Sequence, residues 1–257
     1  MFCYCLGMLP HQRHETILRT LRAEGPAAVR TLAERLGVSQ ATVRRDLEQL
    51  EQEGRLTRVY GGAVPTADHD EPFAQVAGVR VEAKDAIAAR CAEMVKDGDS
   101  VLLDIGTTAH RLARLLHGRS LTVITSNLAV YEELADDPEI QMVVLGGIVR
   151  RSYRSLVGFL TEDALRQVHA DRLFLGTSGV RSDGQVMDTT MVEVPVKRAM
   201  IAASEQVVLI ADADKFPGTG IARVCGPEDL HAVVTNATAD PATCAALRDA
   251  GVEVVTT

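Results

Sequence analysis

The sequence has few of the features that mark metal-bound, secreted or membrane proteins. Its five cysteines are scattered, and no spacing among them resembles a zinc site: Cys3, Cys5, Cys91, Cys225 and Cys244. An odd number of cysteines does not suggest a secreted disulfide scaffold, so reduced thiols are the better interpretation. No apolar run is long enough to span a membrane, and the opening residues lack the positive charge of a signal peptide. We expect a cytoplasmic protein with no metal and no cofactor.

An overall excess of positive charge is also lacking. The formal net charge is −8, which by itself argues against a nucleic-acid partner. The distribution is uneven, because residues 1–66 carry nine arginines and seven acidic residues, about +2, whereas the remainder carries 18 basic and 28 acidic residues, about −10. A slightly basic head on an acidic body is compatible with a DNA-binding domain joined to a regulatory domain.

With 257 residues and a 46% hydrophobic share, the chain can form one large domain or two smaller ones. We see no internal repeat and no low-complexity segment. Residues 1–9 are expected to be an unstructured or non-native leader, because nothing in the head requires residues before about Pro10 and translation could begin at Met8. The other expected parts are a head at 10–66, a linker at 67–82 and a body at 83–257.

The head has the pattern of a winged helix-turn-helix domain. Gly37 suits a tight turn, and Ser39 is a good N-cap for the helix that follows. In that helix Val43, Leu47 and Leu50 recur at i, i+4 and i+7, which predicts one buried stripe. The expected elements are helices at 11–23, 28–36 and 40–53, ended by Gly54, and a short strand at 55–60 followed by Gly61-Gly62.

The outward face of the third helix has the residues that a DNA-recognition helix needs. Small polar residues and arginines at its amino end suit entry into the major groove. The candidate DNA-binding residues are Ser39, Gln40, Ala41, Thr42, Arg44 and Arg45 on this helix, with Arg55 and Arg58 on the wing. An ordinary amphipathic helix with solvated arginines would explain any one feature. The ordered series of turn, cap, paired arginines and basic wing favours DNA binding.

This run resembles the DNA-binding domain of the DeoR family of bacterial transcriptional regulators. The family pattern, a VS-x-x-T-[IV]-RRDL helix and a wing ending in GGA, matches Val38-Ser39, Thr42 to Leu47, and Gly61-Gly62-Ala63. The family commonly has an arginine eight residues before the lysine that matches Lys84. This chain has Val76 there, in the segment that we expect to be a linker because it contains prolines and a glycine.

The body alternates between helical and strand patterns. Its strands are short, continuous apolar runs, which predicts a mostly parallel sheet covered by helices on both faces, an α/β fold. The expected helices are 84–95, 109–116, 128–135, 160–168, 192–203 and 241–250. The expected strands are 101–104, 121–125, 142–145, 173–176, 207–211, 232–235 and 252–255.

Polar residues follow several of these strands, at the edge of the sheet where ligands of open α/β folds bind. The loop 104–108 precedes a helix, and its glycine, threonine hydroxyls and free amides form a ready anion pocket. The candidate effector-binding residues are Asp104, Gly106, Thr107, Thr108, Thr125, Asn127, Gly146, Gly147, Asp212 and Lys215. Amides and threonines would hold a phosphate, the aspartates and Asn127 would contact sugar hydroxyls, and Lys215 would add charge.

Ordinary turn chemistry is the competing explanation. For the Gly146-Gly147 pair and for the 125–127 loop alone we favour that explanation. For Asp212 with Lys215 a local salt bridge is an even alternative. Convergence of all these loops on one edge of the sheet favours a site for a phosphate and hydroxyls.

The resemblance to the DeoR family extends over the body, from Asp104-x-Gly106-Thr107-Thr108 through Asp212-x-x-Lys215-Phe216. It implies a sensor domain with a fold like ribose-5-phosphate isomerase, which binds a phosphorylated sugar or related metabolite. Two positions depart from the family pattern. Asp214 stands where a serine is usual, and Asn236 where an aspartate commonly ends the late strand.

We therefore expect a transcriptional regulator of a carbohydrate-metabolism operon. Repressors are the commonest regulators in such families, so repression is the expected direction. It would bind operator DNA as a homo-oligomer, a dimer or tetramer, and a phosphorylated sugar would modulate that binding. One alternative is a sugar-phosphate isomerase-like enzyme with a DNA-binding head, in which Asp212 and Lys215 act as acid and base. Another is a body that only dimerises.

Overall fold

The computed structural model describes residues 10–24, 27–52, 55–59, 61–64 and 72–257. The expected leader, Gly54 and the first part of the expected linker lie outside the described residues. The chain forms two compact units, residues 1–69 and 70–257. Among the described residues, none of the helices has the length and apolar character needed to cross a bilayer.

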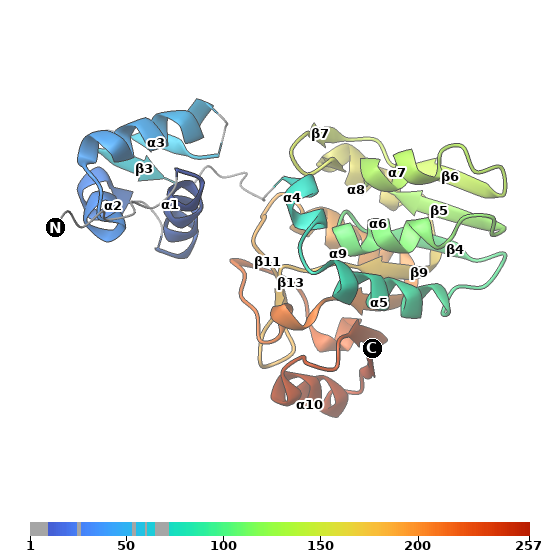
Figure 1. Ribbon diagram of the computed structural model, residues 1–257. Coiled ribbons are helices and arrows are strands. Elements are labelled where there is room, and N and C mark those ends of the chain that lie inside the picture. Colours follow the sequence, from blue (N-terminus) through green and yellow to red (C-terminus); the bar gives the residue numbers. More distant parts are fainter. Residues whose placement is uncertain (1–9, 25–26, 53–54, 60, 65–71) are drawn as a thin grey trace. The chain divides into compact units, whose positions relative to one another are not determined.

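The first unit is a three-helix domain with a small antiparallel sheet (Figure 1), which confirms the expected winged helix-turn-helix fold. Gly37 adopts φ 65° where α2 ends, and the Ser39 hydroxyl accepts a hydrogen bond from the Thr42 amide at 3.1 Å. The strand order is β1-β3-β2. The elements are α1 (Pro10–Glu24), β1 (Ala27–Ala28), α2 (Val29–Leu36), α3 (Gln40–Gln52), β2 (Thr57–Val59) and β3 (Gly62–Val64).

Strands β1 and β3 were not expected as separate elements, and Gly62 explains their close approach. A Cβ atom at Gly62 would lie 2.3 Å from the Ala27 carbonyl oxygen, so the pairing of β1 with β3 requires glycine there. The core of this unit is formed by side chains from all three helices and by Leu56, which precedes β2: Ile17, Leu21, Leu32, Val43, Leu47, Leu50 and Leu56.

A buried ion pair joins the first helix to the third. Asp46 is 5% exposed and accepts hydrogen bonds from Arg13 at 2.8 Å and from His14 at 3.2 Å. Burial alone would raise the pKa of Asp46, but the hydrogen bonds from Arg13 and His14 outweigh burial and lower it. The aspartate of the RRDL motif therefore fixes α3 on α1 and leaves the two preceding arginines exposed.

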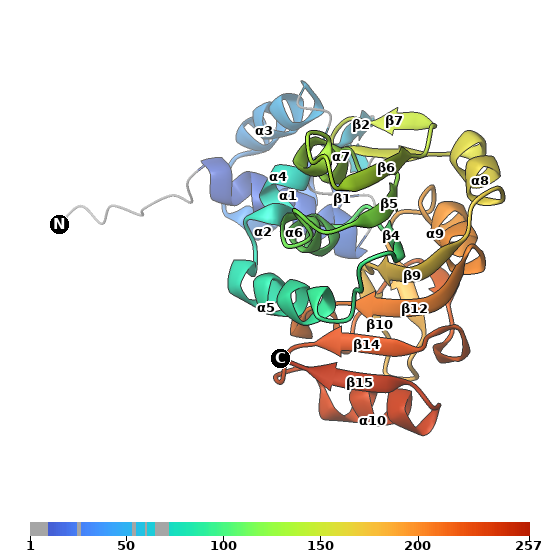
Figure 2. The ribbon, with the colours of Figure 1, turned by 90° about the vertical axis from the view of Figure 1, so that its right-hand side faces the viewer.

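The second unit is built on a seven-stranded parallel sheet in the order β15-β14-β12-β9-β4-β5-β6 (Figure 2), as the strand pattern predicted. Its strands are β4 (Ser100–Leu103), β5 (Leu121–Thr125), β6 (Ile140–Val144), β9 (Ala170–Leu175), β12 (Ser204–Ile210), β14 (Ala232–Thr235) and β15 (Glu253–Thr256). Its helices are α4 (Phe73–Ala77), α5 (Val81–Ala92), α6 (Thr107–Arg114), α7 (Leu128–Leu134), α8 (Phe159–Leu165), α9 (Val194–Ala202) and α10 (Pro241–Asp249).

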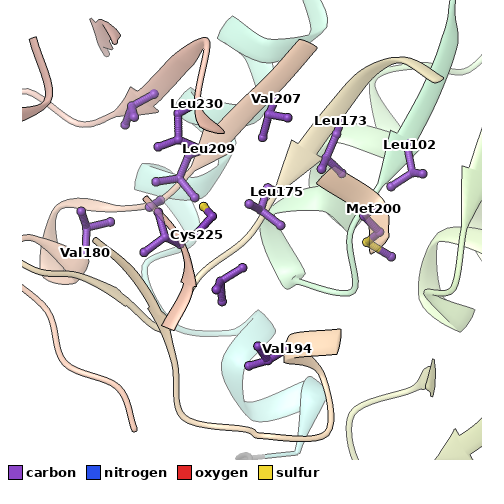
Figure 3. Packing of buried hydrophobic residues seen from close by; sticks show 14 of the residues in the cluster. Leu102, Leu173, Leu175, Val180, Val194, Met200, Val207, Leu209, Cys225 and Leu230 are labelled. Carbon is purple, nitrogen blue, oxygen red and sulfur yellow. The ribbon is translucent and has the colours of Figure 1, made fainter. Parts of the chain in front are cut away.

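Helices cover both faces of this sheet because successive strand residues point to opposite sides. Leu173 and Leu175 of β9 pack in one apolar cluster with Met200 of α9 (Figure 3), whereas Phe174 between them packs in the other. The second cluster also contains Ile87 of α5 and side chains from α6 and α7. The continuous apolar runs in the sequence therefore reflect burial on both faces.

Three features of this unit were not expected from the sequence. A small antiparallel sheet has the order β10-β11-β13, and β7 pairs with β8 as a hairpin. These strands have two to four residues and lack a run that could be recognised: β7 (Ile148–Arg150), β8 (Ser155–Val157), β10 (Gly179–Val180), β11 (Val186–Asp188) and β13 (Ala222–Cys225). The third is α4, which is followed directly by α5.

The described part of the expected linker, residues 72–82, belongs to the second unit, which corrects the expectation of a linker through residue 82. Phe73 is 4% exposed, and its amide donates to the Ser152 carbonyl oxygen at 2.9 Å. The ring of Phe73 also meets the rings of His110 and Tyr153 edge-on. Pro72 and Gly78 bound a short helix, and burial of one aromatic side chain holds that helix in place.

Candidate functional site

The sheet changes its direction of growth between β4 and β9. From β4 the chain builds outward through β5 and β6, and then returns to place β9 on the other side of β4. The carboxyl ends of two such strands leave a crevice in which ligands of α/β proteins bind. Asp104 follows β4 and Gly176 follows β9 at this point. Asp104, a candidate from the sequence, therefore lies at the switch point of the sheet.

A buried ion cluster lies at this switch point of the sheet. The Lys197 ammonium donates to Asp104 Oδ2 at 2.9 Å and to the Gly176 carbonyl oxygen at 2.9 Å, and it lies 3.2 Å from Asp188 Oδ2. All three charged side chains are less than 5% exposed. Burial would lower the pKa of Lys197, but the charges of Asp104 and Asp188 outweigh burial and raise it, so the lysine stays protonated.

One oxygen of this cluster is left for another partner. Asp104 Oδ2 accepts from Lys197 and from the Gly176 amide at 2.8 Å, but Asp104 Oδ1 is buried and has no hydrogen-bond partner among the described residues. An ionised carboxylate oxygen without a donor is costly inside a protein. The arrangement therefore provides an acceptor for a hydroxyl or another donor of a ligand.

The first turn of α6 lies directly after Asp104 and contains three predicted site residues. Gly106 is the N-cap of α6, and no side chain caps the helix. Thr107 and Thr108 are both less than 10% exposed. The first amides of a helix have no intrahelical acceptor, and the helix dipole favours negative charge beside them. The first amides of α6 are therefore suitable donors to an anion, and the predicted anion binding there stays a prediction.

Thr125 ends β5 and Asn127 follows it, and the hydrogen bonds recorded for both side chains are with other residues of the protein. The Thr125 hydroxyl donates to the Leu103 carbonyl oxygen at 2.8 Å. Asn127 caps α7 with its oxygen, and its amide group donates to the carbonyl oxygens of Asp104 and Gly106 at 3.2 and 3.4 Å. Both side chains position the loop that contains Asp104, and their direct contact with a ligand stays a prediction.

Gly146 and Gly147 lie after β6, two strands from the crevice in the sheet order. A Cβ atom at Gly147 would lie 2.1 Å from the Thr161 hydroxyl, and the Gly146 carbonyl oxygen accepts from that hydroxyl at 2.7 Å. The close packing explains the glycine at 147 without a ligand. The structure gives no contact between this pair and the Asp104 loop, so their role in binding also stays a prediction.

Three cations, Lys84, Arg111 and Lys215, are electrostatic neighbours close to the turn after β12. Asp212 caps the short helix η1 (Ala213–Lys215) and accepts from the Asp214 amide at 3.2 Å, while Lys215 ends that helix. Burial lowers the pKa of Lys84 to about 8; the negative charge of Asp212 opposes this effect, and the positive charges of Lys215 and Arg111 reinforce it. These four side chains are therefore electrostatic neighbours and carry a net positive charge.

Asn236 joins this turn to neighbouring elements. Its side-chain oxygen accepts from the Ala213 amide at 3.3 Å, and its amide group donates to the Ala83 carbonyl oxygen at 3.2 Å and to the Thr257 hydroxyl at 3.1 Å. An asparagine both donates and accepts, which an ionised aspartate cannot do. Asn236, which departs from the family pattern, therefore connects η1 to α5 and to the residue that follows β15.

Lys84 and Asp188 were absent from the sequence-based candidates, and Lys197, although it lies within the family resemblance, was not among the predicted binding residues. Lys84 shares one helix face with Ile87, Ala88 and Cys91, all buried, at spacings of three, four and seven. A lysine in an otherwise apolar stripe is a signal that could have been used. Asp188 offered none, because its strand belongs to the small sheet that sequence patterns did not reveal.

The candidate DNA-binding residues differ in how available their charges are. Those on α3 are exposed or partly exposed: Ser39, Gln40, Ala41, Thr42, Arg44 and Arg45. Arg44 donates to Gln40 at 3.3 Å, and the described residues give Arg45 no hydrogen bond or ion pair. Arg55 and Arg58 instead have acidic neighbours, Glu15 at 2.9 Å and Glu48 and Glu51 at 3.6 Å, respectively. The helix arginines are therefore the more available cations.

Comparisons with known proteins decide the family. Residues 13–67 match the family described as the DeoR-like helix-turn-helix domain, and residues 79–237 match the DeoR C terminal sensor domain. The chain belongs to the DeoR family of transcriptional regulators. The expected resemblance is thereby confirmed over both units.

Full-length relatives have the same organisation. An uncharacterised helix-turn-helix regulator, YulB of Bacillus subtilis, is 32% identical over 96% of both chains. The glycerol-3-phosphate regulon repressor of Escherichia coli is 32% identical over 88% of this chain and 90% of its own. The transcriptional repressor AccR of Agrobacterium fabrum is 36% identical over 87% of this chain and 88% of its own. These DeoR-family relatives are named regulators or repressors, which confirms a regulator rather than an enzyme.

Among solved structures, ribose 5-phosphate isomerase A from Neisseria gonorrhoeae aligns with 52% of this chain and 53% of its own, with 19% identity and a TM-score of 0.37. A likeness at this level supports no conclusion about ligand or activity. The α/β class of the sensor domain rests on the parallel sheet itself.

Lys197→Met tests the ion cluster of the DeoR-type sensor domain. Removal of the ammonium leaves two buried carboxylates without a counter-ion, so the free energy of unfolding should fall by about 3–5 kcal/mol near neutral pH. Because the pKa of Lys197 is raised, its contribution is fully present below its unfolded value of about 10.4. Calorimetric unfolding of the full chain measures this change.

The exposed Lys96→Met is the matched control and should change stability by less than about 0.5 kcal/mol. Equal stability of the two variants would contradict a supporting role for the cluster.

Proposed function

We propose that this DeoR-family regulator represses a carbohydrate-metabolism operon and that a phosphorylated sugar weakens its operator binding. The observation that supports the proposal most is the unpartnered, buried Asp104 Oδ1 at the switch point of the sheet. It lies beside the uncapped amino end of α6, in a domain edge that also carries the cations of η1 and α5. The edge therefore offers an acceptor for hydroxyls and groups that attract a phosphate.

The phosphate group of the ligand would bind backbone amides, threonine hydroxyls and lysine ammonium groups. The first amides of α6 and the hydroxyls of Thr107 and Thr108 are suitable donors. Lys215 is partly exposed, and Lys84 has one recorded acceptor, the Val76 carbonyl oxygen, although an ammonium can donate three hydrogen bonds. A phosphate dianion near these cations would compensate their mutual repulsion.

The sugar end would meet the carboxylates. Asp104 Oδ1 can accept from one hydroxyl. Asp212, which is 6% exposed, follows β12, and β12 is separated from β4 by β9 in the sheet order. A Cβ atom at Gly176 would lie 3.2 Å from Asp104 Oδ2, so glycine there keeps the surroundings of this carboxylate uncrowded. Several hydroxyls and one phosphate are the chemistry that this distribution fits.

Names of relatives support this ligand class. Two relatives from Escherichia coli are named the glycerol-3-phosphate regulon repressor and the putative aga operon transcriptional repressor. Each name connects a protein of this family with carbohydrate or polyol metabolism. The individual ligand of the present chain belongs to the same class in our proposal.

On DNA, α3 would enter the major groove, and Arg44 and Arg45 would supply most of the contacts. The wing arginines are partly neutralised by Glu15, Glu48 and Glu51. A single head with few available cations binds weakly, so we infer that two or more copies bind paired half-sites as a homo-oligomer.

A mobility shift on DNA from upstream of the protein's own gene, at fixed salt and with a panel of sugar phosphates, tests the function. Arg45→Ala should weaken operator binding at least tenfold, because one lost arginine contact costs about 1–3 kcal/mol in each half-site. Lys215→Ala should leave operator binding unchanged and reduce release by the sugar phosphate about tenfold.

Arg248→Ala, on the exposed surface of α10, is the control for both effects. Specific binding that no sugar phosphate releases would reject the proposed ligand class. Undiminished release from Lys215→Ala would show that the ligand binds elsewhere in the protein.

The low pKa of Lys84 predicts a pH dependence of ligand binding. Burial lowers this pKa to about 8, and only the ammonium form attracts a phosphate. Affinity for the sugar phosphate should therefore fall above about pH 8, by at most tenfold per pH unit, as Lys84 loses its proton. Calorimetric titrations across this range should show the fall in the native chain and a weaker, flatter response in Lys84→Met.

A further inference from the structure

The segment that follows the junction of the two units is held against the sensor domain at both of its ends. At its start, Phe73 is buried and its amide donates to the Ser152 carbonyl oxygen at 2.9 Å. At its end, the carbonyl oxygen of Val76 accepts from Lys84 Nζ at 2.6 Å, and that of Ala77 accepts from Arg111 at 2.9 Å. The last carbonyls of a helix need such partners, and here two cations supply them.

Those two cations are electrostatic neighbours of the candidate phosphate site. Lys84 is close enough to Lys215 and Asp212 for each charge to influence it, and Arg111 stands one turn after the threonines at the start of α6. The carbonyl oxygens of α4 and an incoming phosphate therefore draw on the same positive groups. A dianion is the stronger partner for an ammonium than a carbonyl oxygen is.

A second connection runs from the segment to the effector loop itself. Arg80, between α4 and α5, forms an ion pair with Asp214. Asp214 is the middle residue of η1, between Asp212 on one side and Lys215 on the other. Arg80 also has φ 55°, a left-handed conformation that a non-glycine residue adopts only when its surroundings favour it.

The ion pair joins the two segments through their side chains. The cation that contacts η1 comes from residue 80, and its partner is Asp214. Loss of either charge removes the one direct side-chain link recorded between residues 72–80 and η1.

We propose that the Arg80–Asp214 ion pair and the Lys84–Val76 hydrogen bond form a latch, which holds α4 while the effector site is empty and loosens when an anion binds there. The inference rests on the proposed function of the site and states how it is regulated. Residues 72–80 lie directly after the segment that joins the two units in sequence. Loosening of α4 therefore changes the attachment of that joining segment to the sensor domain. Both sites then bias one two-state element, as allosteric coupling requires.

An exposed ion pair usually contributes little to stability. The alternative is therefore that the Arg80–Asp214 pair has no effect on the position of α4. Hydrogen exchange of the full chain, measured on the peptide that covers residues 73–82, separates the two. Inorganic phosphate, with chloride at equal ionic strength as reference, is the probe anion. Calorimetry of the same samples shows whether phosphate binds.

Two variants remove the latch with little other disturbance. Arg80→Asn removes the charge but tolerates the left-handed conformation, and Asp214→Ser removes the partner. Arg90→Asn and Asp163→Ser are matched controls, because Arg90 and Asp163 are exposed and form local ion pairs with Glu93 and Arg166. A charge exchange, Arg80→Asp with Asp214→Arg, keeps the pair with its polarity reversed.

In the native chain, saturating phosphate should raise exchange over residues 73–82 about tenfold. Arg80→Asn and Asp214→Ser should show raised exchange without phosphate and less than about a twofold further rise with it, while binding phosphate at least as tightly as the native chain. Both controls should behave like the native chain, and the charge exchange should restore most of the response.

Phosphate binding without any change over residues 73–82 would overturn the latch and leave the proposed function standing. Variants that respond like their controls would also overturn it. If phosphate binds neither the native chain nor the controls, the anion site itself is wrong, and the latch is rejected with it.

Discussion

The interaction on which the sensor domain depends is the contact of the buried Lys197 ammonium with Asp104 and Asp188. It joins α9, the end of β4 and the small sheet, three elements that are far apart in the sequence, at the point where the parallel sheet reverses its growth. One lysine cannot satisfy every oxygen of two carboxylates, and Asp104 Oδ1 is left over. The interaction that stabilises the switch point of the sheet thus also creates its capacity to bind a donor.

Local patterns in the sequence predicted much of the fold. Ser39 as a cap, the stripe of Val43, Leu47 and Leu50, and the apolar runs of the parallel strands are short-range signals, and the structure has the corresponding elements. The site was only partly predictable. Lys197 and Asp104 are 93 residues apart, and no periodicity brings them together. The small sheet and α4 also lack a repeating pattern, because each depends on tertiary contacts such as the burial of Phe73.

In the proposed latch, the cations connect ligand binding in the sensor domain to its response. Lys84 and Arg111 satisfy the end of α4 while they stand beside the turn that contains Asp212 and Lys215. A site whose positive groups are already engaged can bind an anion only by loosening something else. In the DNA-binding unit the situation is simpler, since Asp46 fixes α3 and leaves Arg44 and Arg45 outward.

In our proposal, this protein couples a phosphorylated ligand to operator binding. Linkage requires that the factor by which the ligand weakens operator binding equal the factor by which the operator weakens ligand binding. The most direct test is calorimetric titration of the releasing sugar phosphate into the full chain, alone and saturated with operator DNA. We predict a ligand affinity lower by about 5–150-fold on DNA, equal to the change in operator affinity. Equal ligand affinity with and without DNA would contradict the account.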